Sequence, residues 1–198
     1  MFYDAIRNDH GMEVDPFKAI VAPRPIGWVS TLSRDGIANL APFSFFNAVA
    51  DDPHYVVLGI GAGKDTLRNA RETGEFAVNL ATYALREQMN ASSANAAPHV
   101  DEFELAHLAK APCRMIRSPR VGESPACLEC RVHKIEDLPD DEGRMHYGLI
   151  IGRVIGIHID DRFIANGRVN TAAMQPIARM GYSEYATVTE AWRMRRPN

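Results

Sequence analysis

Two short stretches of the chain combine side chains that could hold a ligand. Residues 59–66 read Gly-Ile-Gly-Ala-Gly-Lys-Asp-Thr, so Lys64 offers a cation and Thr66 a hydroxyl where a helix is predicted to begin. The first N–H groups of a helix lack partners within it, and an anion there gains about 0.3–1 kcal/mol from the helix dipole. The pattern indicates a phosphate site. The plainer alternative makes Asp65 a helix N-cap and leaves Lys64 in solvent.

The same stretch does not match the standard nucleotide-binding loops. A P-loop needs glycine at the position of Leu58 and Ser or Thr at the position of Asp65. The dinucleotide pattern G-x-G-x-x-G fails as well, because Lys64 stands in place of its last glycine. Nucleoside triphosphates are therefore disfavoured as ligands. Lys64, Thr66 and the predicted helix N-terminus could still bind a phosphate group.

The second stretch, residues 41–47, reads Ala-Pro-Phe-Ser-Phe-Phe-Asn. It is too apolar for an ordinary loop and too interrupted by polar residues for a simple core strand. Phe45 and Phe46 could form an apolar wall, and Ser44 and Asn47 could supply hydrogen bonds. A flat, partly polar ring such as a flavin needs both. The plainer alternative places the phenylalanines in the core and Asn47 in a turn.

A hairpin is expected to bring Ser30 and Thr31 near the same place. Residues 26–32 alternate as a strand, with Trp28 and Ser30 on one face and Thr31 on the other. Asp35-Gly36 is a strong hairpin signal, because glycine takes positive φ without strain. The chain would then return along residues 37–46. Ser30 and Thr31 would therefore lie close to residues 41–47.

The remaining pattern favours a mainly β fold with inserted helices. Strands are expected at 26–32, 37–46, 55–60, 75–80, 126–135, 145–159 and 185–188, a short helix at 67–73 ending at Gly74, and two helical pieces within 83–110. Glycines within 145–159 suggest bends or bulges. Because the strands follow one another as hairpin neighbours, an antiparallel sheet or barrel is favoured over a parallel fold.

Composition narrows the class of protein. The chain has 198 residues, 46% of them hydrophobic, which suits one domain over residues 1–198. Its formal net charge is −3, whereas a nucleic-acid footprint would be basic. No apolar run approaches the roughly 18–20 residues that span a bilayer, and the N-terminus lacks the apolar region of a secretory signal. We therefore expect a cytoplasmic protein with neither nucleic acid nor membrane as partner.

The three cysteines do not form a metal site by pattern. An odd number cannot complete a disulfide framework within one chain. Cys127 and Cys130 lie three apart on a predicted strand, so their side chains should point to opposite faces. No second close pair of cysteines follows, and His133 has no recognised ligand spacing. Buried, ordinary thiols are the expectation.

Taken together, the motifs resemble the flavin reductase-like family, whose fold is the FMN-binding split barrel. The resemblance is dense in the first eighty residues, at 24–31, 35–36, 39, 41–47, 52–53, 64–66, 69, 72–76 and 78–79. It also includes 123–125 and 128–130, and it ends with 176–179. It implies an antiparallel Greek-key β-barrel with inserted and flanking helices. It also implies a homodimer with the flavin near the interface between the two copies.

The resemblance assigns cofactor-binding positions residue by residue. Those lining the flavin are Trp28, Ser30 and Thr31; those holding the ring and ribityl chain are Ser44, Phe46 and Asn47; those at the phosphate are Lys64 and Thr66; and Arg179 lies in a C-terminal segment that covers the site. It assigns no metal and no catalytic residue. Some family members carry a histidine just before a strand ending in Ile-Gly, but the offset from His146 to Ile151-Gly152 does not match.

The implied activity is reduction of a flavin by NADH or NADPH, with FMN as the expected flavin and FAD as the open alternative. The flavin carries the hydride chemistry, so no protein acid or base is obligatory. A separate oxygenase is the expected consumer of the reduced flavin. Two alternatives remain open at this stage: an electron-transfer flavoprotein that keeps its FMN, and a non-catalytic flavin-binding module.

Overall fold

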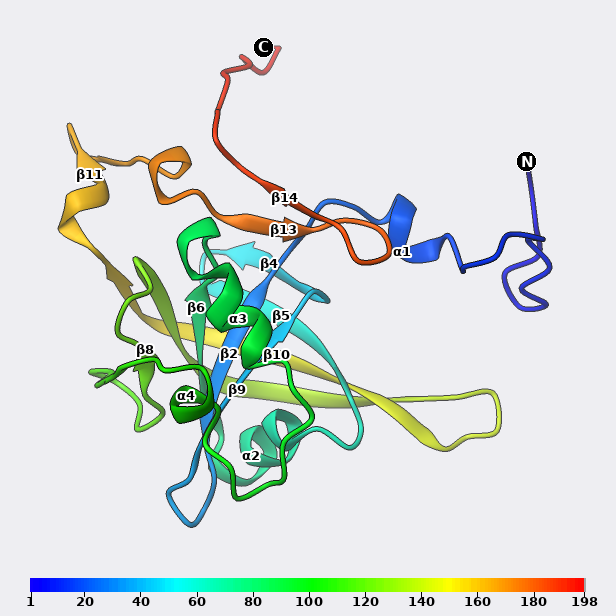
Figure 1. Ribbon diagram of the computed structural model, residues 1–198, viewed down its shortest axis with the longest axis horizontal. Coiled ribbons are helices and arrows are strands. Elements are labelled where there is room, and N and C mark those ends of the chain that lie inside the picture. The colour runs from blue at the N-terminus through cyan, green and yellow to red at the C-terminus, as the bar shows by residue number, and fades with distance from the viewer. Residues whose placement is uncertain (198) are drawn as a thin grey trace.

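A seven-stranded antiparallel sheet forms the body of the computed structural model, which describes residues 1–197. The strand order is β3–β2–β6–β9–β10–β5–β4. The bounds are β2 Gly27–Leu32, β3 Ala38–Phe43, β4 Phe46–Asp51, β5 His54–Gly61, β6 Glu75–Leu80, β9 Ala126–Pro139 and β10 Met145–Ile159. The last two make a long hairpin that projects from the body in Figure 1. The predicted mainly β, antiparallel fold is confirmed.

Smaller elements cover the sheet. A second sheet pairs β1 (Arg24–Pro25), β13 (Ile177–Arg179) and β14 (Tyr185–Thr187), and two short pairs join β7 (Lys110–Ala111) to β8 (Arg120–Val121) and β11 (Ile164–Ala165) to β12 (Arg168–Val169). The helices are α1 Phe17–Ile20, α2 Asp65–Thr73, α3 Arg86–Ala91 and α4 Glu102–Leu105, with 3-10 turns at Tyr83–Leu85, Asp161–Phe163 and Ala172–Met174. Figure 1 shows α3 and α4 in front of the sheet and α2 at one end.

Strand β2 separates two hydrophobic cores, because alternate side chains of a strand point to opposite faces. Trp28 packs with Leu40 and Phe103 in the core that α3 and α4 cover. Val29 packs in the second core, which draws residues from five strands and α2: Val56, Leu58, Ile60, Leu67, Ala70, Phe76, Val78, Cys130 and Ile150. Both faces of β2 are therefore buried, as its apolar sequence requires.

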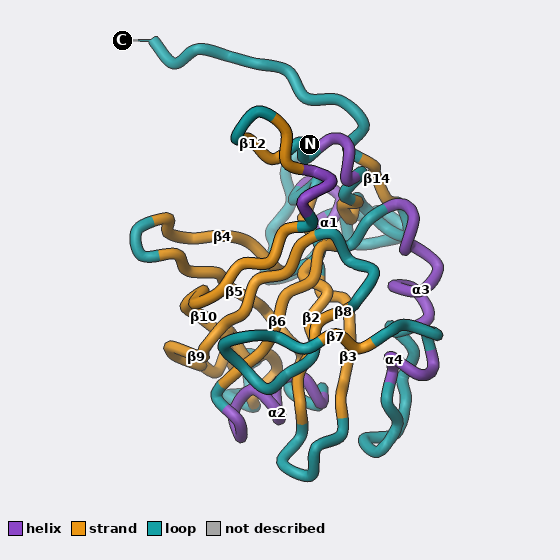
Figure 2. Tube along the Cα trace, turned by 90° about the vertical axis from the view of Figure 1, so that its left-hand side faces the viewer, coloured by secondary structure: helices purple, strands orange, loops and turns teal. Residues whose placement is uncertain are grey.

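The predicted returning strand at 37–46 is in fact two strands, and this part of the prediction is wrong. β3 pairs with β2, whereas β4 pairs with β5, so β3 and β4 are the two edges of the sheet (Figure 2). The chain passes from one edge to the other through Ser44 and Phe45 alone. The ring of Phe46 then lies against Gly27, where an added Cβ would be 2.9 Å from the Phe46 Cγ. The two edges thus meet at this end of the sheet.

The structure also bears on the expected bulges and on the expected helices at 83–110. The bulges predicted for the glycine-rich strand occur before Gly152 and before Gly156. Gly152 is also required for packing, because a Cβ there would lie 2.3 Å from the ring of Phe76. The region 83–110 is less helical than predicted, since residues 92–101 connect α3 to α4 without a helix. Among the described residues, no helix is long and apolar enough to cross a membrane.

Candidate ligand-binding site

The N-terminus of α2 carries free donors, as predicted. Lys64 is the N-cap residue in extended conformation, and no side chain caps the helix. Asp65 is therefore not the N-cap; it lies inside the first turn and pairs with Arg68. Within residues 1–197, the N–H groups of Asp65 and Thr66 have no hydrogen-bond partner. These two N–H groups and the Lys64 ammonium form a donor set suited to an anion.

A polar pocket of about 170 Å³ opens beside these donors. We call it the polar pocket; it is lined by Asn39, Ala41, Pro42, Phe43, Gly63, Lys64, Asp65, Thr66, Ser92, Ser93, Ala94, Asn95, Ala96 and Glu102. The Lys64 Nζ donates to Asn95 Oδ1 at 2.9 Å, which ties the 92–96 segment to the start of α2. Strand β3, helix α2 and the connection from α3 to α4 therefore build its walls together.

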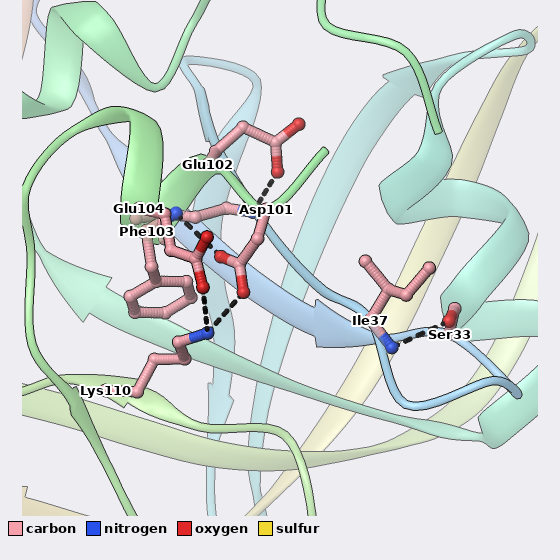
Figure 3. Close-up of polar contacts among 8 residues, drawn as sticks. Ser33, Ile37, Asp101, Glu102, Phe103, Glu104 and Lys110 are labelled. Carbon is pink, nitrogen blue, oxygen red and sulfur yellow. Dashed lines mark hydrogen bonds and ion pairs between the residues drawn. The ribbon is translucent and has the colours of Figure 1, made fainter. Parts of the chain in front are cut away.

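Glu102 is the buried acid of this pocket. Its residue is only 5% exposed, and its Oε2 accepts a hydrogen bond of 3.0 Å from the N–H of Leu40 on the edge strand β3. Burial raises the pKa of the Glu102 carboxyl, and the nearby Asp65 and Asp101 act in the same direction. Figure 3 shows how the carboxylates of Asp101 and Glu104 converge on Lys110 and fasten α4 in place. Sequence reasoning did not find Glu102.

An apolar groove of about 910 Å³ borders the later part of residues 41–47. We call it the apolar groove; its lining includes Phe17, Ile20, Val21, Pro23, Arg24, Pro25, Ser44, Phe45, Phe46, Asn47, Val57, Leu138, Pro139, His146, Tyr147 and Leu149. The predicted residues Ser44, Phe46 and Asn47 are thus brought together here. The polar pocket takes residues 41–43 and the apolar groove takes residues 44–47, so both border the segment where the sheet edges meet.

Three predicted cofactor residues lie in the interior instead. Trp28, Ser30 and Thr31 are fully buried, and none of them lines either hollow. The Trp28 indole N–H donates to the Ser92 hydroxyl at 2.9 Å. The Ser30 hydroxyl donates to a backbone carbonyl, and Thr31 Oγ1 accepts from the Asn69 amide at 3.1 Å. Their side chains hold the strand and the neighbouring helices in position, and the cofactor contact predicted for them remains a prediction.

Arg179 lies next to Arg24, because the two residues are paired in register on strands β13 and β1. Arg24 is buried and lines the apolar groove, and its Nε donates to the Ser44 hydroxyl at 3.4 Å. Burial and the nearby Arg179 lower the pKa of the Arg24 guanidinium. Arg179 itself donates to the carbonyl of Tyr182 and lies outside the groove. Sequence reasoning missed Arg24, although the two prolines that flank it were a signal.

The structure places His146 in the apolar groove and buries Cys127 and Cys130. His146 lies in the apolar groove with its ring 5.0 Å from that of Tyr147. Cys130 packs in the core with Phe76, whereas Cys127 belongs to a separate cluster with Ile116, so the two thiols face opposite sides as predicted. A hydrogen bond with Cys113, together with burial, raises the pKa of the Cys127 thiol, and burial raises the pKa of the Cys130 thiol. Within the described chain no group of three or more His, Cys, Asp or Glu could hold a metal ion.

An antiparallel sheet whose two edges meet beside a ligand-sized hollow is the split-barrel architecture. A solved structure from Shewanella frigidimarina with a split barrel domain has this fold, with a TM-score of 0.84 over the whole of both chains and 19% identity. The chain belongs to the flavin reductase-like family, because its residues 21–172 match the flavin reductase like domain.

Relatives with higher identity support the assignment. An uncharacterised protein of Aquifex aeolicus is 37% identical over 172 residues, which cover 84% of this chain and 85% of that one. The solved structure of nitrilotriacetate monooxygenase component B from Bacillus cereus is 30% identical, with a TM-score of 0.89 over 98% of each chain. The resemblance inferred from the motifs is therefore confirmed at the level of the family and the fold.

Proposed function

We propose that this protein binds FMN and reduces it with NADH or NADPH, supplying reduced flavin to a separate oxygenase. One observation carries the proposal: an anion-type donor set and an apolar groove border the same short segment, residues 41–47. A flavin mononucleotide has the matching chemistry, with a phosphate at one end and a flat ring at the other. Membership of the flavin reductase-like family supports it.

The residues present fit the two ends of FMN. For the phosphate, Lys64 and the free N–H groups of Asp65 and Thr66 provide charge and hydrogen bonds. For the ring, Phe45 and Phe46 provide an apolar surface, while Ser44 and Asn47 provide hydrogen-bonding groups beside it. A terminal phosphate in the polar pocket makes FMN the proposed cofactor ahead of FAD.

The chain's own part in the reaction is binding and orientation. When bound, FMN supplies the hydride acceptor, so the protein needs no acid or base for the transfer itself. The apolar groove, of about 910 Å³, offers an apolar surface against which the ring would be oriented. Arg24 holds the Ser44 hydroxyl, and so fixes the segment that the ring would contact. No catalytic residue is assigned.

The partners in this proposal are a second copy of the chain and an oxygenase. Phe17, Ile20 and Phe45 are exposed along the apolar groove, which leaves a surface that a homodimer would cover. The oxygenase is proposed because the similar solved structure from Bacillus cereus is a monooxygenase component. Such a partner would consume the reduced flavin that leaves the groove.

The test is a spectroscopic titration of the purified protein. FMN should bind with quenched fluorescence, and catalytic amounts of protein should then oxidise NADH or NADPH in proportion to the FMN added. A flavin that stays bound without any oxidation of pyridine nucleotide would point to electron transfer or to a binding module. Absence of flavin binding would overturn the proposal.

A further inference from the structure

Glu102 is a buried carboxyl without a cation to balance it. Only 5% of the residue is exposed, and one carboxylate oxygen, Oε2, accepts from the Leu40 N–H at 3.0 Å. No lysine or arginine among residues 1–197 lies within ion-pair distance of it. Burying a charge without a partner is costly, so the neutral form gains in such a place.

The groups facing Glu102 from its neighbouring elements differ in sign: burial and the carboxylates of Asp65 and Asp101 raise its pKa, whereas hydrogen bonds from the backbone N–H groups of Leu40 and of Glu102 itself lower it. Helix α2 contributes Asp65, and its N-cap contributes Lys64, while α4 is preceded by Asp101. Asp65 is balanced by Arg68 and Asp101 by Lys110. Strand β3 contributes only the Leu40 N–H, and the 92–96 segment carries no charged residue. Burial is the largest of these influences, and the pKa of Glu102 is raised on balance.

A phosphate in the same pocket makes the ionised form still less favourable. Glu102 and Lys64 both line the polar pocket, which measures about 170 Å³. Two like charges in so small a space repel, whereas a neutral carboxyl can donate a hydrogen bond to a phosphate oxygen. The Oε2 atom keeps its bond from Leu40, so the proton belongs on the other oxygen, Oε1.

We propose that Glu102 binds the phosphate of FMN as a neutral acid, donating a hydrogen bond from Oε1 to a phosphate oxygen. This inference rests on the proposed function. The proton comes from solvent, no other bond is made or broken, and binding of FMN is accompanied by uptake of up to one proton. Riboflavin has a neutral hydroxyl in place of the phosphate, so it causes less uptake. Glu102 thus favours the phosphorylated flavin in a pH-dependent way.

Calorimetry in two buffers of different ionisation enthalpy measures this proton directly. At pH 7, the wild-type protein should take up more protons with FMN than with riboflavin. Glu102→Gln keeps both a hydrogen-bond acceptor for Leu40 and a donor, and it should abolish the part of the uptake that Glu102 contributes. Glu104→Gln is the matched control, because Glu104 lies on the same helix with its side chain 79% exposed, and its uptake should equal that of wild type.

A second measurement needs no variant. Between pH 7 and 9 the phosphate of FMN is about nine-tenths ionised or more, because its second pKa is about 6. The preference of wild type for FMN over riboflavin should therefore fall with rising pH, by up to about tenfold per unit once Glu102 titrates. A constant preference, together with equal proton uptake in wild type and Glu102→Gln, overturns this inference alone. Binding of neither flavin overturns the proposed function and the inference with it.

Discussion

Asn39 and Thr66 are joined by a hydrogen bond of 2.9 Å, from the Asn39 Nδ2 amide to the Thr66 hydroxyl. Asn39 lies on the edge strand β3, and Thr66 lies in the first turn of α2, and both residues are buried. This bond fixes the free donors of the helix against the strand that leads into residues 41–47. The two stretches singled out from the sequence are therefore parts of one structural unit.

Replacing Lys64 with alanine should weaken FMN binding about ten- to a hundredfold and leave riboflavin binding nearly unchanged. The reason is that a hydrogen bond to a charged group contributes about 1.5–3 kcal/mol, and riboflavin has no phosphate to receive it. Fluorescence titration with each flavin measures the effect. Lys134→Ala is the control, because Lys134 is an exposed lysine of β9 that pairs with Glu136. Equal losses for the two flavins would rule out Lys64 as the phosphate ligand.

Replacing Asn47 with alanine should cost flavin affinity by about 1–3 kcal/mol, because a buried polar group on the ligand would lose its partner. The fold should be unaffected, since Asn47 is exposed on β4 and its Oδ1 accepts only from the adjacent Ala48 N–H. Thermal unfolding of the apo-protein beside flavin titration separates the two effects. Val49→Ala, on the same exposed strand, is the control. An unchanged dissociation constant with a lower melting temperature would make Asn47 a purely structural residue.

The wild-type protein should sediment as a dimer, and Ile20→Asp should shift it toward monomer. Ile20 ends α1 and is 75% exposed within the apolar groove, where a charge would be desolvated on association. The exposed Ile164, outside the groove, gives the control substitution Ile164→Asp. Sedimentation velocity at low micromolar concentration measures both. A wild-type monomer with full flavin occupancy would contradict a site shared between two copies.

Glu102→Gln should stabilise the apo-protein at neutral pH but not at acid pH. The pKa of Glu102 is raised above its ordinary value of 4.5 in the folded protein. Its favourable contribution to the free energy of unfolding is therefore fully present below the unfolded pKa and is lost as the pH rises through the folded pKa. Glutamine never ionises, so it escapes that loss. Urea unfolding at pH 4 and pH 7.5 tests this; an equal stability difference at both pH values would refute it.

Local signals in the sequence were enough for several elements. Strand β6 spans the predicted residues, β10 spans the predicted 145–159, and α2 ends at Gly74 with φ of 73°, as a glycine stop requires. These features depend on the alternation of side chains along a strand and on single residues such as Gly74. The positions of Lys64, Thr66, Ser44, Phe46 and Asn47 on two adjacent hollows agree with the motif-based expectation, while their contact with a cofactor remains a prediction.

Features that depend on long-range pairing were not predictable in this way. The break at Ser44 and Phe45 arises because β4 pairs with β5 rather than with β2, and a single strand pattern carries no information about its partner. Glu102 and Arg24 also make contacts with residues far away in sequence, Glu102 with Leu40 and Arg24 with Ser44 and Met180. One acid among the three of residues 101–104 gives no sign in the sequence that it alone is buried. The inward orientation of the Ser30 side chain likewise depends on a distant residue, because its hydroxyl donates to the backbone carbonyl of Pro119.

The central claim is that the polar pocket and the apolar groove together bind an FMN that NADH or NADPH reduces. The most direct measurement is the absorbance of the protein with one equivalent of FMN, followed under anaerobic conditions after addition of NADH or NADPH. We predict a bound-flavin spectrum that bleaches in the presence of one of these donors, at a rate that Lys64→Ala lowers when FMN is not saturating. A flavin that does not bind, or that binds and stays oxidised with both donors, would contradict the account.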